Sequence, residues 1–177
     1  MDPYQGCLVA LLGASDRALI VAHLHALDME DRINRFCCVT TDESIEQYVN
    51  GIRFGQDIVL GTLAEGRVVG FVHAPVFDEG RERVCEIGIS VDAGFRKTGI
   101  GKRMLQASIA TANSLQIRRV YVQYMTSNGP MAALARSAGG RLERDGSESS
   151  AVFEAEAPVL RGGKPCRARS LGLEAVS

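Results

Sequence analysis

The sequence predicts a single α/β domain with a mixed, mainly antiparallel central sheet flanked by helices. Its 177 residues fit one domain at roughly 150 residues per domain, and a hydrophobic content of 46% suffices for a core. Two helical patterns come first, followed by strand-like runs that short turns connect. A glycine-rich segment then leads into alternating helix and strand. We expect the domain to span residues 1–156, with a basic, flexible tail over residues 157–177.

The N-terminal half is predicted to contain two helices and an antiparallel meander. Apolar positions recur at helical spacing over residues 16–27, and Thr40-Thr41-Asp42-Glu43 has the form of a capping box that opens the second helix. The turn residues Glu65-Gly66 favour a hairpin. Three strands are predicted, at residues 57–64, 67–77 and 82–91.

The C-terminal half begins with Gly94–Arg103, a glycine-rich segment that carries four cations. A helix follows, in which Leu105, Ile109 and Ala112 share one face. The remaining predictions are a strand at 118–125, a helix at 128–138, and a closing hairpin of strands at 141–145 and 150–156.

Charge and cysteine content exclude several classes of protein. Twenty basic and 21 acidic residues give a net charge of −1, so nucleic acid is not indicated as a partner. The five cysteines have no metal-ligand spacing and indicate reduced thiols. His23 and His25 would lie on different faces of one helix, where they cannot bind one metal ion, so we interpret them as ordinary polar or boundary residues. The absence of a signal peptide pattern and of a long apolar run predicts a cytoplasmic protein that spans no membrane.

The glycine-rich segment has the composition of a phosphate-binding loop. Gly99 and Gly101 would let backbone N–H groups converge on an oxyanion at the positive end of the next helix. A Walker A motif fails because Ile100 stands where lysine is required, and a Rossmann fingerprint fails at Met104, where a third glycine is required. The loop therefore belongs to neither of these nucleotide-binding classes.

The pattern Arg96-x-x-Gly99-x-Gly101, preceded by Val91-Asp92, resembles the pyrophosphate-binding signature of the GNAT acyltransferase superfamily. The order of predicted elements over residues 6–156 is similar to that fold. The resemblance implies acetyl-CoA, or another acyl-CoA, as co-substrate, and no metal. It implies that the backbones of Ile89 and Val91 pair with the pantetheine arm, and that Asn128 steadies the far end of that arm. The pyrophosphate would be held by Arg96, Lys97, Thr98, Gly99, Ile100, Gly101 and Lys102.

Further residues resemble the bacterial protein-lysine acetyltransferase branch of this superfamily. They are the segment Asp31–Phe36 and the segment Asn128-Gly129-Pro130-Met131, and in that branch a glutamate stands in the register of Glu86. Two positions depart from common GNAT patterns. Ala135 stands where many members have a tyrosine, and Gly140 replaces an aromatic residue, which would loosen the pocket wall.

The chemistry of amine acylation suits Glu86 as a general base. An amine attacks a thioester only when neutral, while a lysine amine has a pKa of roughly 10.4, so a base is needed, and a carboxylate such as Glu86 can take the proton directly or through a water. Alternation alone is also compatible with a solvated strand residue at Glu86. His73 is interpreted as a packed or pocket residue, Tyr124 as a core residue, and Cys85 as facing away from Glu86.

The predicted function is N-acetyl transfer from acetyl-CoA to a primary amine, either a small molecule or a protein lysine. A non-catalytic acyl-CoA-binding or regulatory module is the alternative. An interaction domain whose basic tail binds an acidic partner is a third reading. The identity of the acceptor and the oligomeric state have no signature in the sequence.

Overall fold

The computed structural model of the chain describes residues 8–154. Within these residues the helices are α1 (Arg17–His25), α2 (Met29–Phe36), α3 (Asp42–Asn50), α4 (Ile100–Ser114) and α5 (Gly129–Ser137). The strands are β1 (Val9–Leu11), β2 (Ile58–Ala64), β3 (Arg67–Ala74), β4 (Val76–Glu79), β5 (Glu82–Glu86), β6 (Gly88–Val91), β7 (Arg119–Met125), β8 (Arg141–Asp145) and β9 (Glu148–Glu154). The predicted tail at 157–177 lies outside the described residues.

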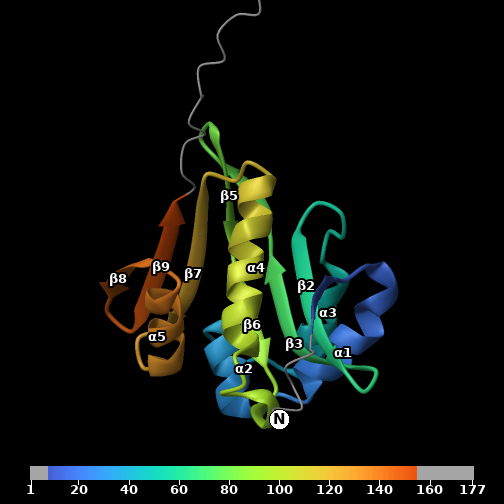
Figure 1. Cartoon of the computed structure of the whole chain (residues 1–177). Coiled ribbons are helices and arrows are strands. Elements are labelled where there is room, and N and C mark those ends of the chain that lie inside the picture. The colour runs from blue at the N-terminus through green and yellow to red at the C-terminus, as the bar shows by residue number, and fades with distance from the viewer. Residues whose placement is uncertain (1–7, 155–177) are drawn as a thin grey trace, which may run out of the picture.

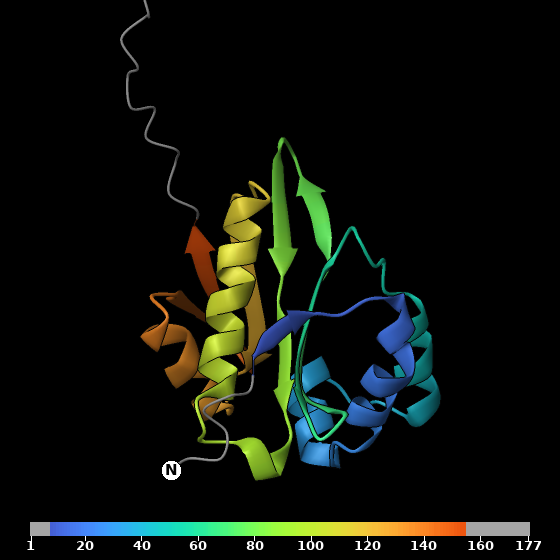
Figure 2. The same ribbon diagram turned by 45° about the vertical axis from the view of Figure 1, so that its right-hand side comes forward.

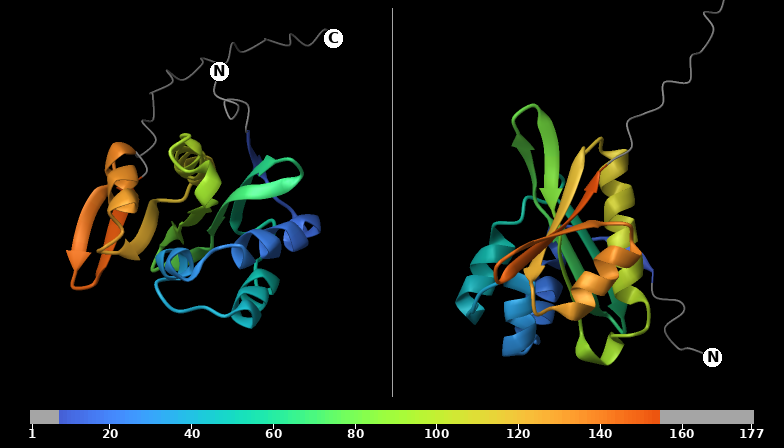
Figure 3. Two further views of the ribbon diagram at one scale, coloured as in Figure 1. Left: turned by 90° about the horizontal axis from the view of Figure 1, so that it is seen from below. Right: turned by 90° about the vertical axis from the view of Figure 1, so that its left-hand side faces the viewer.

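The strands form two sheets that separate at β6 and β7. One sheet has the order β1-β2-β3-β6, and the other has the order β4-β5-β7-β9-β8. Only β5 and β7 pair in parallel among the described strands, so the predicted mixed, mainly antiparallel architecture is confirmed. Figure 3 shows this separation from below, with β7–β9 and α5 on one side and β2, β3 and α1–α3 on the other.

Helices cover both faces of the first sheet. Alternate residues of β2 point in opposite directions, so that Leu60 packs in the same core as α4, while Val59 packs in the core formed by α1 and α3. Helix α4 lies close against β3, because a Cβ atom at Gly70 would lie 2.6 Å from Met104 Sδ. Figures 1 and 2 show α4 crossing the sheet on the face opposite α1 and α3.

The N-terminal half contains one helix more than predicted. The segment Met29–Phe36, which lies between the two predicted helices, forms α2. Asp28 caps it by accepting a hydrogen bond from the Asp31 N–H at 2.8 Å, and Cys37 ends it in the left-handed region at φ 57°. The segment is rich in charged residues with few apolar ones, so its helical periodicity is weak in the sequence.

Two predicted strands are each divided. The strand expected at 67–77 breaks at Pro75, which has no N–H to donate, and continues as β4 in the other sheet. The strand expected at 82–91 changes partner at Ile87, whose N–H donates to the Tyr121 carbonyl of β7 at 2.7 Å, whereas β6 pairs with β3. Because of these breaks, each of the two predicted strands contributes to both sheets. The sheets therefore separate between β6 and β7.

Other local predictions hold. Glu65 and Gly66 both have positive φ, at 51° and 73°, as a type I′ hairpin turn requires. Thr41 caps α3 by accepting from the Ser44 N–H at 3.2 Å. Tyr124 is buried in the core, as predicted.

His23 is an exception to its interpretation as an ordinary polar residue, because it is buried. Its Nε2 lies 2.8 Å from Ser90 Oγ, and its Nδ1 lies 2.8 Å from Asp92 Oδ1. It thus connects α1 to the C-terminal end of β6 and to the residue that follows it. No helix among residues 8–154 is long and apolar enough to cross a membrane.

Candidate functional site

The free edge of β6 presents backbone groups to a groove. Asp92 N–H donates to the Val69 carbonyl at 2.9 Å, and in an antiparallel ladder every second residue bonds to the same neighbour. The backbone groups of Ile89 and Val91 therefore face away from β3, toward β7. The Val91 carbonyl accepts from Arg96 Nε at 3.2 Å, which agrees with this orientation.

The groove has a volume of about 960 Å³ and runs from α2 along β6 to α5. Its lining includes eight of the ten residues predicted to bind the co-substrate: Ile89, Val91, Arg96, Lys97, Gly99, Gly101, Lys102 and Asn128. Thr98 and Ile100 are not part of the lining. The Thr98 hydroxyl donates to the Phe95 carbonyl at 2.6 Å, and the Ile100 side chain is buried in the core.

The loop before α4 has the geometry of an anion cradle. Gly99 precedes the helix at φ +82°, a conformation that favours glycine, and no side chain caps the helix there. The first helical hydrogen bond of α4 is donated by the Arg103 N–H to the Gly99 carbonyl at 3.1 Å. The N–H groups of Ile100, Gly101 and Lys102 thus lie at the positive end of a 15-residue helix without a helical acceptor.

Two of the predicted binding residues in the groove, Arg96 and Asn128, already have protein partners. Arg96 forms an ion pair with Asp31 of α2. Asn128 caps α5, because its Oδ1 accepts from the Met131 N–H at 3.0 Å, and its amide NH₂ has no hydrogen bond within the described chain. A phosphate ligand would thus compete with Asp31 for Arg96.

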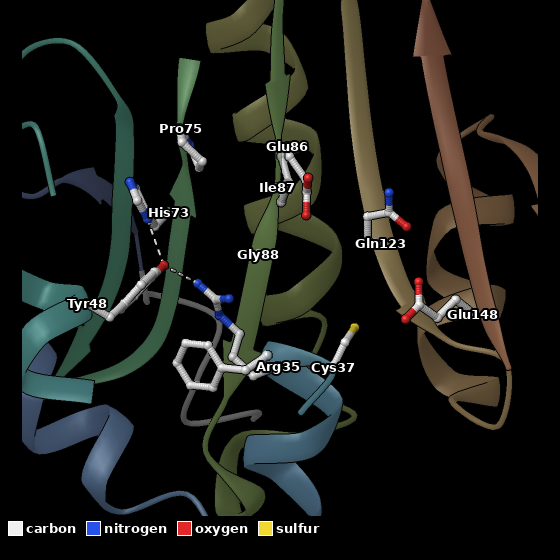
Figure 4. A pocket seen from close by; sticks show the side chains of 11 residues that line it. Arg35, Cys37, Tyr48, His73, Pro75, Glu86, Ile87, Gly88, Gln123 and Glu148 are labelled. Carbon is white, nitrogen blue, oxygen red and sulfur yellow. Dashed lines mark hydrogen bonds between the residues drawn. The ribbon is translucent and has the colours of Figure 1, made fainter. Parts of the chain in front are cut away.

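A second, smaller pocket of about 360 Å³ adjoins the groove. Glu86 lines this pocket, together with Cys37, Tyr48, His73 and Glu148 (Figure 4). Four residues line both the pocket and the groove: Arg35, Ile87, Gly88 and Gln123. The two cavities therefore meet at Gly88, where the strands separate.

Glu86 and Cys85 point in different directions, as strand alternation predicts. The Glu86 side chain is exposed and forms no hydrogen bond or ion pair within residues 8–154. Cys85 is buried, and burial raises the pKa of its thiol to about 12. Burial, and then the negative charges of Glu148 and Glu86, also raise the pKa of Cys37. Neither thiol is a thiolate at neutral pH, so neither is an activated nucleophile.

A chain of hydrogen bonds runs from the core to the pocket. His73 is buried, with Nε2 3.2 Å from Asp57 Oδ2 and Nδ1 2.7 Å from the Tyr48 hydroxyl. Burial lowers the pKa of His73 below its usual value, outweighing the opposing effect of Asp57. Burial alone would raise the pKa of Asp57, but hydrogen bonds from Arg53, His73 and the Val76 N–H hold it below its usual value. Asp57 is therefore a carboxylate and His73 a neutral imidazole near pH 7.

Several pocket residues were not singled out as site residues from the sequence. Tyr48 lies within the second predicted helix and Glu148 stands directly after the hairpin turn, and neither residue belongs to a motif. Arg35 belongs to the quoted segment Asp31–Phe36, and that segment was the available signal. Gly140 lines neither cavity: the Phe153 ring lies where a Cβ at Gly140 would be, 2.7 Å from Phe153 Cζ.

A groove with free N–H groups at a helix start opens, between separating strands, onto a polar pocket, and this arrangement is typical of a group-transfer domain. The acetyltransferase (GNAT) family profile matches residues 21–139. The chain therefore belongs to the GNAT acetyltransferase family. No group of three or more His, Cys, Asp or Glu side chains that could hold a metal ion occurs within the described part of the chain.

Solved structures have the same fold at low sequence identity. The GNAT domain of S. lividans PAT is 16% identical, with a TM-score of 0.70 over 82% of this chain and 89% of that chain. A GNAT-family acetyltransferase from Streptococcus pneumoniae is 18% identical, with a TM-score of 0.67 over 84% of this chain and 99% of that chain. RimL, a ribosomal L7/L12 alpha-N-protein acetyltransferase in complex with coenzyme A, is 17% identical, with a TM-score of 0.64 over 86% and 97%. No curated protein matches the sequence.

Proposed function

We propose that the protein transfers an acetyl group from acetyl-CoA to a primary amine by direct attack within a ternary complex. The observation that carries this proposal is the meeting of the groove and the pocket at Gly88. A donor in the groove and an acceptor in the pocket would approach each other from opposite sides of the separated strands. That arrangement needs no covalent enzyme intermediate.

The groove fits acetyl-CoA in size and in chemistry. The N–H groups at the start of α4, with Arg96, Lys97 and Lys102 beside them, would hold the pyrophosphate. The outward backbone groups of Ile89 and Val91 would pair with the amides of the pantetheine arm as an added strand. The thioester would then lie toward Gly88, next to the acceptor pocket.

Glu86 is proposed as the general base. The amine nitrogen forms a bond to the thioester carbonyl carbon, its proton passes to the Glu86 carboxylate directly or through a water, and the C–S bond breaks to release CoA. A backbone N–H at the free edge of β6, near Ile89, would stabilise the oxyanion. Support for Glu86 comes from its place in the pocket lining and from its carboxylate, which has no partner in the described chain.

The acceptor is proposed to be a primary amine, of a small molecule or of a protein lysine. Incubating the protein with acetyl-CoA and a panel of small amines and lysine peptides, with mass spectrometry and CoA thiol release as readouts, tests the reaction. We expect an acetylated amine and CoA in equal amounts, above the enzyme-free blank. Binding of acetyl-CoA without transfer to any amine would instead identify a non-catalytic module. This outcome has to be tested because Ala135 stands where many family members have a tyrosine, so no tyrosine hydroxyl is available there as a general acid.

A further inference from the structure

The guanidinium group of Arg35 occupies the junction between the groove and the acceptor pocket. Arg35 lies near the end of α2 and reaches over β6, so that a Cβ atom at Gly88 would collide with its NH1. Arg35 lines both cavities. Whatever binds at the junction therefore contacts a positive charge.

The guanidinium of Arg35 has N–H groups that form no hydrogen bond within residues 8–154. Its NH2 donates to the Tyr48 hydroxyl at 2.6 Å, and its Nε is buried without a hydrogen-bond partner. No carboxylate of residues 8–154 lies within ion-pair distance of Arg35. A half-buried guanidinium with one neutral partner is an incomplete arrangement, because a buried charge is stabilised by a counter-ion.

The position of Arg35 is fixed from the core. Asp57 is a carboxylate, so His73 donates its Nε2–H to Asp57 and accepts at Nδ1 from the Tyr48 O–H. The Tyr48 oxygen is then left to accept from Arg35, as Figure 4 shows. The guanidinium also stacks on the Phe36 ring, 4.9 Å from its centroid. A cation held by a buried hydrogen-bond chain and an aromatic ring is a preorganised site for an anion.

The same pocket carries negative charge on other parts of its wall. Glu86 and Glu148 both line it, and neither forms an ion pair with Arg35. The pocket thus presents one positive group and two negative groups within about 360 Å³. A ligand with both an ammonium and a carboxylate matches this distribution, because each of its ends meets the opposite charge.

We propose that the acceptor is a small amine that carries its own carboxylate, as an amino acid does, with the carboxylate on Arg35 and the amine toward Glu86. This inference rests on the proposed transfer reaction and narrows its acceptor. Tyr48 and Phe36, which hold the guanidinium, line the acceptor pocket and not the groove, so the anion belongs to the acceptor and not to the acyl chain. A lysine side chain in a protein has no carboxylate beside its amine.

The test compares matched acceptors with the full chain and acetyl-CoA. The probes are alanine, methionine, phenylalanine and β-alanine, each paired with its carboxamide, together with a lysine peptide. The test variants are Arg35→Gln and Arg35→Lys; lysine keeps the positive charge but loses the planar guanidinium. The matched control is Arg67→Gln, on the exposed tip of the β2–β3 hairpin. Binding of each probe to the protein–CoA complex, measured by saturation-transfer NMR, provides a readout independent of turnover.

We expect at least one free amino acid to exceed its amide by about 10- to 100-fold in kcat/KM, the effect of losing a charge-assisted hydrogen bond. Arg35→Gln should lower kcat/KM for the acid about 10- to 100-fold more than for its amide and so remove this preference, Arg35→Lys should keep part of it, and Arg67→Gln should keep all of it. If Arg35→Gln fails to fold, the preference for acid over amide is compared between the parent and Arg35→Lys instead.

The other outcomes separate the two proposals. Equal or better use of the amides or the lysine peptide, or an Arg35→Gln loss of the same size for acids and for amides, would overturn the amino-acid acceptor while the transfer reaction stands. An Arg35-dependent preference for succinyl-CoA over acetyl-CoA would overturn it too, since the anion would then belong to the acyl chain. Arg35-dependent binding of amino acids without any turnover would support the carboxylate site and overturn the transfer reaction.

Discussion

Replacing Glu86 by glutamine isolates the role of its charge. The side chain keeps its size, and because Glu86 forms no hydrogen bond or ion pair within residues 8–154, the substitution removes no folded-state contact of that kind. The free energy of unfolding should change by less than about 0.5 kcal/mol, as for other exposed positions. Turnover should fall by roughly 10²–10⁴-fold, the usual effect of a positioned base, which corresponds to about 3–5 kcal/mol in the barrier.

The deficit should depend on pH in a defined direction. An amine with a pKa near 10.4 is only about 0.1% neutral at pH 7.4, and this fraction rises about tenfold per pH unit. At high pH the amine arrives already neutral and needs no base, so the rates of the parent and of Glu86→Gln should converge. Acetyl-CoA affinity should not change, because the proposed phosphate contacts lie at the start of α4, away from Glu86.

The assay is steady-state CoA release by both proteins from about pH 6 to 10, with Glu46→Gln as a control. Glu46 is exposed on α3, lines neither cavity and has no ion pair or hydrogen bond to another side chain, so its variant should follow the parent. Parallel profiles of parent and Glu86→Gln, separated by less than about threefold, would refute the role of Glu86. His73, or a water held by backbone carbonyls, would then have to accept the proton.

Three further substitutions test the groove, the packing and the buried histidine. Arg96→Ala should weaken acetyl-CoA binding by roughly 1–3 kcal/mol in calorimetry, because a charged partner of phosphate is lost, and unchanged affinity would remove Arg96 from the site. Gly70→Ala should lower the free energy of unfolding by roughly 1–3 kcal/mol in urea titrations, since its Cβ would lie 2.6 Å from Met104 Sδ, and a change near zero would mean that Met104 yields freely. The parent should lose stability as pH falls below about 6.5, because burial lowers the pKa of His73 and the unfolded chain then binds a proton that the native state does not. His73→Gln should reduce this slope by at most about 1.4 kcal/mol per pH unit, and an unchanged slope would contradict a neutral His73.

Local sequence patterns predicted most elements but not where the chain changes sheets. The turn at Glu65-Gly66 and the cap at Thr41 depend on a few neighbouring residues, and both hold. The division of β5 from β6 at Ile87 depends on which strand accepts each N–H, and this is decided by β7, more than 30 positions further along the chain. Pro75 was a local signal for the break between β3 and β4, and the continuous apolar run around it concealed that signal.

The two halves of the candidate site differ in how far the sequence reveals them. The phosphate loop is one contiguous segment, so its glycines and cations could be placed together from their order alone. The acceptor pocket gathers Arg35, Tyr48, His73 and Glu148 from four separate elements, and only tertiary packing brings them beside Glu86. The burial of His23 has the same origin, because its partners lie on the β6 region.

The central claim is that the groove before α4 binds acetyl-CoA through its pyrophosphate. Calorimetric titration of acetyl-CoA into the parent, Gly101→Ala and Gly101→Glu tests it most directly. A Cβ at Gly101 would make only ordinary contacts, 3.7 Å from Leu134 Cδ2 and 3.8 Å from Val91 Cγ2, so all three proteins should melt alike. We predict binding to the parent and to Gly101→Ala, and none to Gly101→Glu, whose carboxylate would occupy the phosphate position. Equal affinity in all three proteins would contradict the claim.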